Sequence, residues 1–286
     1  MKIKSSTRPR LCARLDVKNS LLVKGTNFEG LAALGETIDF AIAYYLSGID
    51  EIHIFDVVSS LYSVDYLKST INRMSKDCFV PVSVGGGIDS LSKIETLLKL
   101  GADKVIINSA SYGNYPFISR AAKEFGSSTI CVAVDYIYES SIPTCVSHFG
   151  KIQQDVLFGD HIQRILDSSP GELIFSSVDK DGTGQGFDSH ISTFLPVQPS
   201  IPVIVHAGAG SFDHCQLPFE NPMIAGCSIS SLLHYNLLRE RTDLVSKLPH
   251  NRTSRNVARK MASPIYESIS PSVLITNFKS HFNYFK

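Results

Sequence analysis

Residues 80–90 read VPVSVGGGIDS and residues 201–211 read IPVIVHAGAGS, so an apolar run that ends in a glycine-rich turn occurs twice. Pro81 and Pro202 in these two stretches are 121 residues apart. Three other pairs have nearly the same separation: Ile54 and Ile174 (120), Ser109 and Ser230 (121), and Asp16 and Asp135 (119). Solenoid repeats are much shorter, roughly 20–50 residues. The spacing therefore predicts two fused halves of similar structure.

Eight short apolar runs, rich in β-branched residues, predict eight strands: residues 11–17, 51–57, 80–86, 103–109, 128–135, 172–178, 201–207 and 223–229. Runs of this kind are typical of parallel strands with both faces covered. Segments of helical periodicity separate them, for example 89–101, where Asp89 or Ser90 can cap the start and Gly101 ends the helix. Eight βα units form either a closed barrel or an open doubly wound sheet.

The two similar halves favour the closed form. We therefore predict an α/β fold, a (βα)₈ TIM barrel formed from two similar half-barrels. A single barrel is expected over residues 1–250. Residues 251–286 form a C-terminal extension of unknown structure.

Composition excludes several classes of protein. The 27 basic and 27 acidic residues give a formal net charge of zero, so neither nucleic acid nor an anionic membrane is an expected partner. No apolar run approaches the roughly 20 residues of a membrane span, and the basic N-terminus lacks the apolar stretch of a secretory signal. The six cysteines show no CxxC and no metal-like spacing. A cytoplasmic protein with reduced thiols, no metal and no cofactor is expected.

Asp16 and Asp135 end the first and fifth predicted strands, at equivalent places in the two halves. Catalytic groups of these barrels lie at the carboxyl ends of the strands. A carboxylate there can act as general acid or base when its environment shifts its pKa. A loop-bonding aspartate is the alternative for either residue alone, but their symmetric placement favours an acid–base pair.

Each half also offers a glycine turn beside a small polar turn. Gly85, Gly86 and Gly87 precede Asn108-Ser109 in the first half, and Gly208 and Gly210 precede Ser230-Ser231 in the second. Glycine lets backbone N–H groups approach an anion closely. The duplicated pairing predicts a ligand with a phosphate at each end.

Two further segments belong to the predicted mouth. The loop at 176–188, SSVDKDGTGQGFD, contributes Asp179, Asp181 and Thr183, and its glycines suggest closure over a substrate. An ordinary turn at Gly182 is the alternative. Lys24 is either a lid residue that binds phosphate or a solvated lysine, and the sequence leaves both open.

Seven segments together resemble one known family, the cyclase subunit of imidazole glycerol phosphate synthase from histidine biosynthesis. They extend from about Arg10 to about Arg241: LDVKNSLLVKGTNF (15–28), GIDEIHIFD (48–56), VPVSVGGGI (80–88), GADKVIINSA (101–110), FGSSTICVAVD (125–135), GELIFSSVDKDGTGQGFD (171–188) and HAGAG (206–210). The combination of LDVK, VKGTNF and DKDGT is specific to this branch. The related isomerase of the pathway shares the half-barrel plan and both aspartates but not VKGTNF.

The resemblance implies an ammonia-dependent lyase and cyclase. It would convert a phosphoribulosyl-formimino aminoimidazole carboxamide ribonucleotide, with a phosphate at either end, to imidazole glycerol phosphate and an aminoimidazole carboxamide ribotide. Ammonia would come from a separate glutaminase subunit. Asp16 and Asp135 would be the catalytic pair. The resemblance also implies a set of residues that line the substrate channel: Lys24, Gly87, Asn108, Ser109, Ser177, Asp181, Gly182, Gly208, Ser230 and Ser231.

Four charged residues precede or begin predicted strands, at the opposite end of the barrel: Arg10, Glu51, Lys104 and Glu172. In the family, a ring of paired charges at this place gates a passage for ammonia. Salt bridges at the base of an ordinary barrel are the alternative. Two charges of each sign at the four matching positions favour the gate.

The chain also departs from the family pattern. Residues 136–141 read YIYESS instead of a short basic segment, and His206 and Ala207 crowd the second glycine turn. Two prolines in residues 211–222 predict a short or broken helix. The basic stretch at 252–260 is interpreted as a solvated surface, and the rest of the extension as a packed helix, an interface or a partly disordered tail.

Two other functions remain open. One is a cyclase-like paralogue that helps to supply ammonia for amidinating a sugar in surface-polysaccharide synthesis. Such proteins generally lose the first aspartate motif, whereas LDVK is intact here. The other is a non-catalytic barrel that docks and stabilises a glutaminase, which the altered residues 206–210 would suit.

Overall fold

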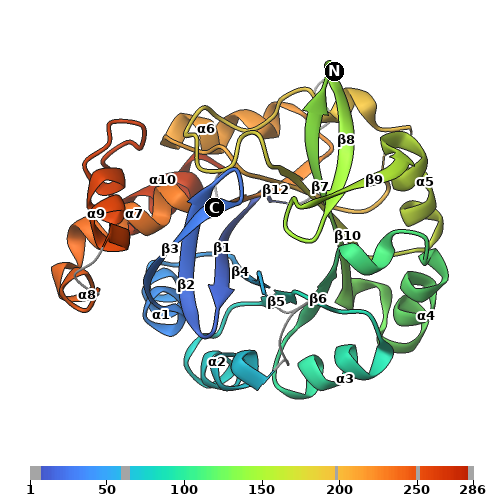
Figure 1. Cartoon of the computed structure of the whole chain (residues 1–286), viewed down its shortest axis with the longest axis horizontal. Coiled ribbons are helices and arrows are strands. Elements are labelled where there is room, and N and C mark those ends of the chain that lie inside the picture. Colours follow the sequence, from blue (N-terminus) through green and yellow to red (C-terminus); the bar gives the residue numbers. More distant parts are fainter. Residues whose placement is uncertain (1–7, 59–64, 197–198, 249–251, 283–286) are drawn as a thin grey trace.

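Eight parallel strands close into a barrel in the computed structural model, which describes residues 8–58, 65–196, 199–248 and 252–282 (Figure 1). The staves are β1 (Arg10–Lys18), β4 (Glu51–Asp56), β5 (Val82–Gly85), β6 (Lys104–Ile107), β7 (Ile130–Glu139), β10 (Glu172–Ser177), β11 (Val203–His206) and β12 (Ile224–Ile229). β7 pairs with β10 and β12 pairs with β1, all in parallel. The ring is therefore closed, which confirms the predicted barrel over an open sheet.

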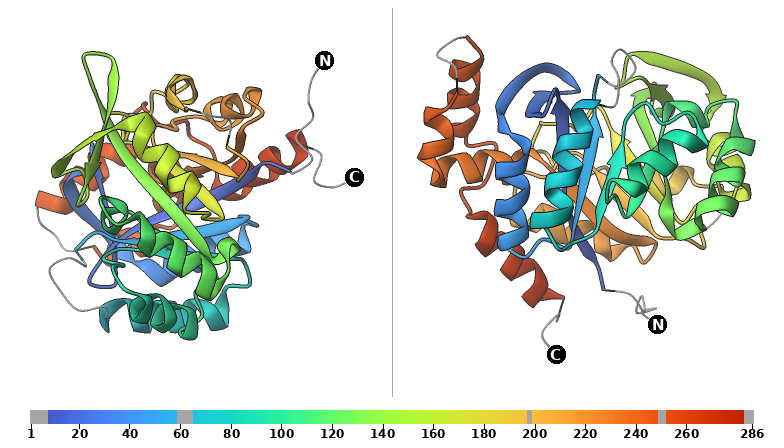
Figure 2. Two further views of the ribbon diagram at one scale, coloured as in Figure 1. Left: turned by 90° about the vertical axis from the view of Figure 1, so that its right-hand side faces the viewer. Right: turned by 90° about the horizontal axis from the view of Figure 1, so that it is seen from below.

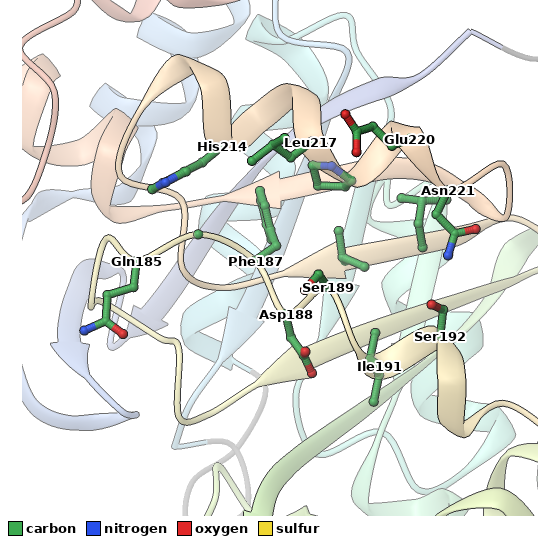
Figure 3. Close-up of a pocket in the computed structure, with 14 residues that line it drawn as sticks. Gln185, Phe187, Asp188, Ser189, Ile191, Ser192, His214, Leu217, Glu220 and Asn221 are labelled. Carbon is green, nitrogen blue, oxygen red and sulfur yellow. The ribbon is translucent and has the colours of Figure 1, made fainter. Parts of the chain in front are cut away.

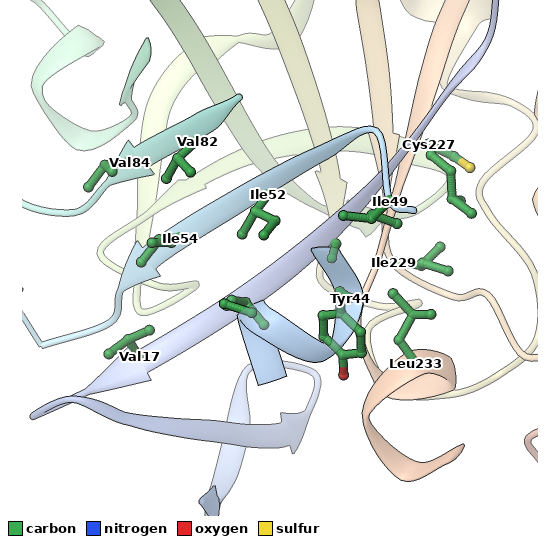
Figure 4. Close-up of a cluster of buried hydrophobic side chains, with 14 of the residues drawn as sticks. Val17, Tyr44, Ile49, Ile52, Ile54, Val82, Val84, Cys227, Ile229 and Leu233 are labelled. Atoms are coloured by element: carbon green, nitrogen blue, oxygen red, sulfur yellow. The ribbon is translucent and has the colours of Figure 1, made fainter. Parts of the chain in front are cut away.

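Helices cover the outside of the ring (Figure 1). They are α1 (Thr37–Leu46), α2 (Asp65–Asp77), α3 (Leu91–Lys99), α4 (Tyr115–Phe125), α5 (Phe158–Asp167), α6 (Phe212–Gln216) and α7 (Ser231–Glu240). Outward side chains such as Val17, Ile52 and Val84 pack with Tyr44 of α1 and Leu233 of α7 in the buried core (Figure 4). This layer holds the staves in place, so their inward side chains are free to line the lumen.

Two units depart from the regular pattern. After β10, the expected helix is replaced, among the described residues, by a 3₁₀ turn at η3 (Ile191–Phe194). Pro196 and Pro199 follow it closely, and proline cannot donate to a helical hydrogen-bond ladder. The predicted broken helix after β11 is confirmed, since α6 passes into η4 (Leu217–Glu220). The other 3₁₀ turns of the described chain are η1 (Ser109–Ser111) and η2 (Ser127–Thr129).

An antiparallel arm rises from the same end of each half-barrel. β2 (Leu21–Thr26) and β3 (Glu29–Glu36) continue from β1, while β8 (Ile142–Ser147) and β9 (Ile152–Leu157) continue from β7. Figure 2 shows the arms at one end of the barrel and the start of β1 at the other. The mouth is therefore bordered by two arms that extend its wall.

The arms show the duplication more clearly than the sequence does. Their turns place eight non-glycine residues at φ between 48° and 69°, in pairs 121 residues apart: Asn19 and Ser140, Ser20 and Ser141, Asn27 and His148, and Phe28 and Phe149. These left-handed conformations are uncommon for residues other than glycine. Their recurrence supports the prediction of two similar halves.

The C-terminal extension packs against elements of both halves. α8 (Thr242–Ser246) leads to α9 (Arg252–Met261), which contacts β3 and α7, and α10 (Pro271–His281) contacts α6 and α7. The connection between α9 and α10 is anchored by Arg239, whose guanidinium donates to the carbonyls of Met261 and Ser263. The helix α9 thus docks on the barrel through Val257, while Arg255 and Arg259 stay exposed, in agreement with the interpretation of the basic stretch as a solvated surface.

The described residues include no helix that is both long and apolar enough to cross a membrane.

Candidate active site

Asp16 and Asp135 lie on the inner face of the barrel near its mouth, 1% and 5% exposed. Asp16 Oδ1 accepts a hydrogen bond from Arg14 Nε at 2.8 Å, and Asp135 Oδ2 accepts one from Asn108 Nδ2 at 2.8 Å. Asp16 Oδ2 and Asp135 Oδ1 are buried without a partner among the described residues. Buried polar atoms are normally hydrogen-bonded, so the two oxygens are available to a ligand.

The pKa of Asp135 is shifted toward neutrality. Burial raises the pKa of Asp135 from 3.8 to about 6, although the charge of Arg14 and hydrogen bonds from Ser176 and Asn108 oppose the rise. A group that titrates near the working pH can both hold and release a proton.

Arg14 is a site residue that the sequence analysis missed. Its guanidinium is buried, donates to Asp16 and, through Nη1, to Ser176 Oγ at 3.2 Å. It also lies 4.0 Å from the ring centroid of Phe55. An arginine inside the apolar run at 11–17, two residues before Asp16, was the available signal, because residues i and i+2 of a strand face the same side.

The tips of the two arms meet over the mouth. Phe28 of the first arm and Phe149 of the second stack with ring centroids 4.3 Å apart and an interplanar angle of 12°. Val146 and Val178 complete a small buried cluster around Phe28. Because Phe28 lies 5.3 Å from the guanidinium of Arg14, this cluster covers the lumen from above.

Lys24 is neither a solvated lysine nor a free phosphate ligand in this structure. It is 2% exposed, and its ammonium donates to both oxygens of Asp181, at 2.6 and 2.7 Å. The same carboxylate accepts from the backbone N–H of Phe28 at 3.4 Å. The pair therefore ties the first arm to the loop after β10.

The first-half anion turn stays open to the mouth. Gly86 and Gly87 have φ of 118° and 58°, a conformation that favours glycine. Asn108, in the neighbouring polar turn, donates to Asp135, and Ser109 Oγ accepts from the backbone N–H of His148 at 3.2 Å. The structure thus places Asn108 and Ser109 beside Asp135.

The glycine turn of the second half borders a cavity of about 10 Å³. This is room for about one water molecule. Its lining includes four of the predicted residues: Gly182, Gly208, Ser230 and Ser231. The hydroxyls of Ser177 and Ser231 are buried without a partner among the described residues. Ala207 has φ of 84°, a strained value for a residue with a Cβ.

The C-terminal extension is anchored to the loops around this cavity. Tyr266, 2% exposed, donates its hydroxyl proton to the carbonyl of Gly182 at 2.6 Å, and the N–H of Glu267 donates to the carbonyl of Gly210 at 2.7 Å. Ile265 lies against Gly184 and Gly210 so closely that a Cβ on either glycine would clash with it. No pattern in residues 251–286 had indicated this contact.

His206 borders the same region. It is buried, and its Nδ1 donates to the carbonyl of Ser228 at 2.9 Å. Burial and the charge of Arg14 lower the pKa of His206 well below 6.5. The ring is therefore neutral, with Nε2 3.9 Å from Asp181 and free to accept a hydrogen bond.

We expect phosphate titration to show two sites of unequal affinity, the first-half site being the tighter. Gly87→Val should abolish the tighter site and Ser231→Leu the weaker one, whereas Ala207→Gly should tighten the weaker one by relieving strain. Isothermal titration with inorganic phosphate measures both affinities. Gly159→Ala is the control, since Gly159 lies in the helix α5 and a Cβ there meets nothing closer than 3.9 Å. A single site, or a tighter second-half site, would contradict this expectation.

The four charged residues at the other end form a closed ring. Arg10 donates to Glu51 at 2.7 Å and also to Glu172, while Lys104 donates to Glu51 at 2.9 Å and to Glu172 at 2.9 Å. Each cation therefore bridges both carboxylates across the base of the lumen. The ring and the mouth are joined by the inner face of β1, since Arg10, Arg14 and Asp16 point inward alike.

A cysteine and a histidine lie together just above this ring. Cys12, His53 and Glu51 offer ligand atoms within 4.8 Å of one another. Burial raises the pKa of the Cys12 thiol well above 9.0, and Glu51 already accepts from Arg10, Lys104 and Ser83. This set is a poor metal site and an inert thiol, because metal ligation and nucleophilic attack need the thiolate.

The pocket shown in Figure 3 lies outside the mouth. Its volume is about 460 Å³, and it lies between the loop after β10 and η4, with Val205 and Ile224 of the barrel wall in its lining. Asp188 in this pocket accepts from the hydroxyls of Tyr136 and Tyr138 at 2.8 and 2.7 Å. None of the predicted site residues lines it.

Comparison with known proteins agrees with this arrangement. The family model described as histidine biosynthesis protein matches residues 10–239. A protein of Staphylococcus saprophyticus named imidazole glycerol phosphate synthase subunit HisF is 35% identical over 230 residues, 79% of this chain and 91% of that protein. One of the same name from Streptococcus sanguinis is 34% identical over 231 residues, 80% of this chain and 91% of that protein. The chain therefore belongs to the histidine biosynthesis protein family.

Proposed function

We propose that this chain is the cyclase subunit of an imidazole glycerol phosphate synthase. It would use ammonia to convert phosphoribulosyl-formimino aminoimidazole carboxamide ribonucleotide to imidazole glycerol phosphate and an aminoimidazole carboxamide ribotide. The observation that carries the proposal is the pair of buried aspartates at the mouth, each with one oxygen that has no partner among the described residues. The names of the HisF relatives support the same activity.

The mouth supplies the groups that this chemistry needs. Asp16 and Asp135 would move protons on the reacting nitrogens, and the pKa of about 6 at Asp135 lets it exchange a proton near neutral pH. Gly87, Asn108 and Ser109 would hold one phosphate of the substrate. Gly208 and Ser231 would hold the other phosphate, for which the cavity of about 10 Å³ beside them has to widen.

The opposite end would receive ammonia from a glutaminase subunit. The ring of Arg10, Glu51, Lys104 and Glu172 closes the base of the lumen, so ammonia would enter only when one of its ion pairs opens. Ammonia is uncharged and small, and a ring of paired charges excludes ions more strongly than it excludes a neutral molecule.

We expect the isolated chain to turn over the ribonucleotide with ammonium chloride and to have no activity with glutamine alone. Cys12 lies beside His53. Burial raises the pKa of the Cys12 thiol, so the thiol stays protonated and does not attack glutamine. Chromatographic detection of imidazole glycerol phosphate measures the reaction. Addition of the glutaminase from the same organism should restore the use of glutamine.

Charge reversal at the base tests the partner. Lys104→Glu should reduce glutamine-dependent turnover while ammonium-dependent turnover remains, because only the first depends on docking and passage. Lys99→Glu is the control, since Lys99 is 73% exposed in its side chain and pairs with Glu95 on α3. No turnover of the bisphosphorylated substrate with either nitrogen source would refute the cyclase proposal and favour a sugar-amidating or purely docking role.

A further inference from the structure

Arg14 occupies a place in the barrel that neither anion binding nor the charge ring explains. It is 1% exposed and lies on the inner face of β1, between the ring at Arg10 and the mouth at Asp16. Arginine is almost never fully buried unless it is paired. Its partner on the same strand is the carboxylate of Asp16, at 2.8 Å.

Three contacts fix the guanidinium in one orientation. Nε is bonded to Asp16, Nη1 is bonded to Ser176 on the opposite side of the lumen, and the plane rests on Phe55, 4.0 Å from its centroid. A planar guanidinium that stacks on a ring while it donates hydrogen bonds has little freedom to rotate. Arg14 is thus a rigid cation beside one member of the acid–base pair.

Asp135, the second aspartate, accepts no hydrogen bond from a cation of the described chain. The bonded oxygen of Asp135 accepts from the neutral amide of Asn108 rather than from Arg14. The groups that face Asp135 come from several parts of the chain: Arg14 and Asp16 of β1, Asn108 directly after β6, Tyr112 after η1, Cys145 of β8 and Ser176 of β10. Arg14 is the one cation in this set.

We propose that Arg14 is a positioning residue for the two aspartates: it fixes the carboxylate of Asp16 by a direct hydrogen bond and, as the one cation among the described residues that faces Asp135, helps Asp135 to release its proton despite its burial. The inference rests on the proposed function, in which both aspartates exchange protons with the substrate. A direct hydrogen bond from a cation favours the ionised form of its acceptor. Asp135 accepts no hydrogen bond from Arg14, but the charge of Arg14 still opposes the rise that burial causes in the pKa of Asp135.

Together the two aspartates balance the protons of the reaction. As the nitrogen derived from ammonia forms its bond to carbon, it would lose a proton to Asp16. As the bond between carbon and the leaving nitrogen breaks, that nitrogen would take the bonding electron pair and the proton of Asp135. The pair then returns to its starting state by exchange of one proton with water.

The test is a direct titration of the carboxyl of Asp135. Carbon-13 NMR of protein labelled at the aspartate carboxyls follows each group with pH, and the signal lost in Asp135→Asn identifies this one. Arg14→Met should move the titration midpoint of Asp135 upward by at least about one pH unit, because the opposing cation is gone. Arg14→Lys, which keeps the charge, should move it less.

Two further variants keep the test decisive. If Arg14→Met does not fold, the double variant Arg14→Met/Asp16→Asn removes both charges of the buried pair and should still raise the midpoint, since Arg14 outweighs Asp16 among the influences on Asp135. Arg241→Met is the control, because Arg241 pairs with Asp243 on the surface. An unchanged midpoint in the folded Arg14 variants would overturn the inference.

The pH profile of ammonium-dependent kcat/KM provides the functional readout. The limb near pH 6 should move upward in Arg14→Met by the amount seen for Asp135, whereas a merely structural role would lower the whole profile without moving its limbs. A wild-type protein without turnover would refute the cyclase, yet the NMR titration would still decide the effect of Arg14. The two failures are therefore distinguishable.

Discussion

Asp135→Asn is expected to lower ammonium-dependent turnover by at least about 10²-fold, the range typical of a lost acid–base group, while it stabilises the protein at pH 8. The asparagine keeps the shape of the side chain and its oxygen can still accept from Asn108, so substrate binding should change much less. Steady-state kinetics give kcat and KM, and urea unfolding gives the free energy of unfolding.

The sign of the stability effect follows from the raised pKa. The folded protein binds the proton of Asp135 more tightly, with a pKa of about 6, than the unfolded chain does at about 3.8. The folded state therefore loses stability as pH rises from about 4 to about 6, and the full loss persists above that range. A shift of about two units corresponds to about 3 kcal/mol, which the asparagine variant regains at pH 8.

Two variants frame this result. Asp16→Asn should lower turnover by a comparable factor, and Asp167→Asn, at an exposed residue of α5, should change neither turnover nor stability. Near-normal turnover in Asp135→Asn would remove this residue from the acid–base pair. Loss of turnover together with loss of stability at pH 8 would point to damage of the fold instead.

Lys24→Met should destabilise the protein by about 3–5 kcal/mol, because it leaves the carboxylate of Asp181 buried without its cation. Both side chains are 1% exposed, and the two N–O distances are 2.6 and 2.7 Å. The loss should be measured as a lower free energy of unfolding in urea at pH 7.

The matched double variant separates pairing from packing. Lys24→Met/Asp181→Leu removes both charges and should recover much of the stability, since a buried pair replaced by apolar side chains is often nearly neutral. Lys99→Met breaks the exposed pair with Glu95 and should cost less than about 1 kcal/mol. A small effect of Lys24→Met would mean that water or a rotamer change satisfies Asp181.

The staves of the barrel and the duplicated plan were predictable from the sequence. A buried parallel strand must be apolar on both faces, so each of the eight staves left a continuous apolar run that local composition reveals. The repeat at 121 residues was visible because both halves use the same turns, and the positive φ pairs at Asn27-Phe28 and His148-Phe149 show that the backbone follows it. The eight-unit pattern also implied a helix after β10, but the described residues there form only a 3₁₀ turn. Pro196 and Pro199 disfavour a helix in this segment.

The positions of Asp16, Asp135, Gly87 and Asn108 near one mouth also followed from the sequence, since parallel staves bring their carboxyl ends to one face. Their catalytic and binding roles remain proposals. Arg14 was overlooked because an apolar run was interpreted as a whole, although the alternation of a strand places Arg14 on the same face as Asp16.

Partners far apart in the chain could be found only in the folded structure. Lys24 pairs with Asp181 at a separation of 157 residues, and the hydroxyl of Tyr266 reaches Gly182 across 84 residues. Local sequence determines which segments become strands, because burial of apolar surface and backbone hydrogen bonding depend on neighbouring residues. Two features depend on distances that exist only after the barrel has closed and its extension has docked. One is which cation neutralises which carboxylate, and the other is that the C-terminal extension donates hydrogen bonds to the loops at Gly182 and Gly210.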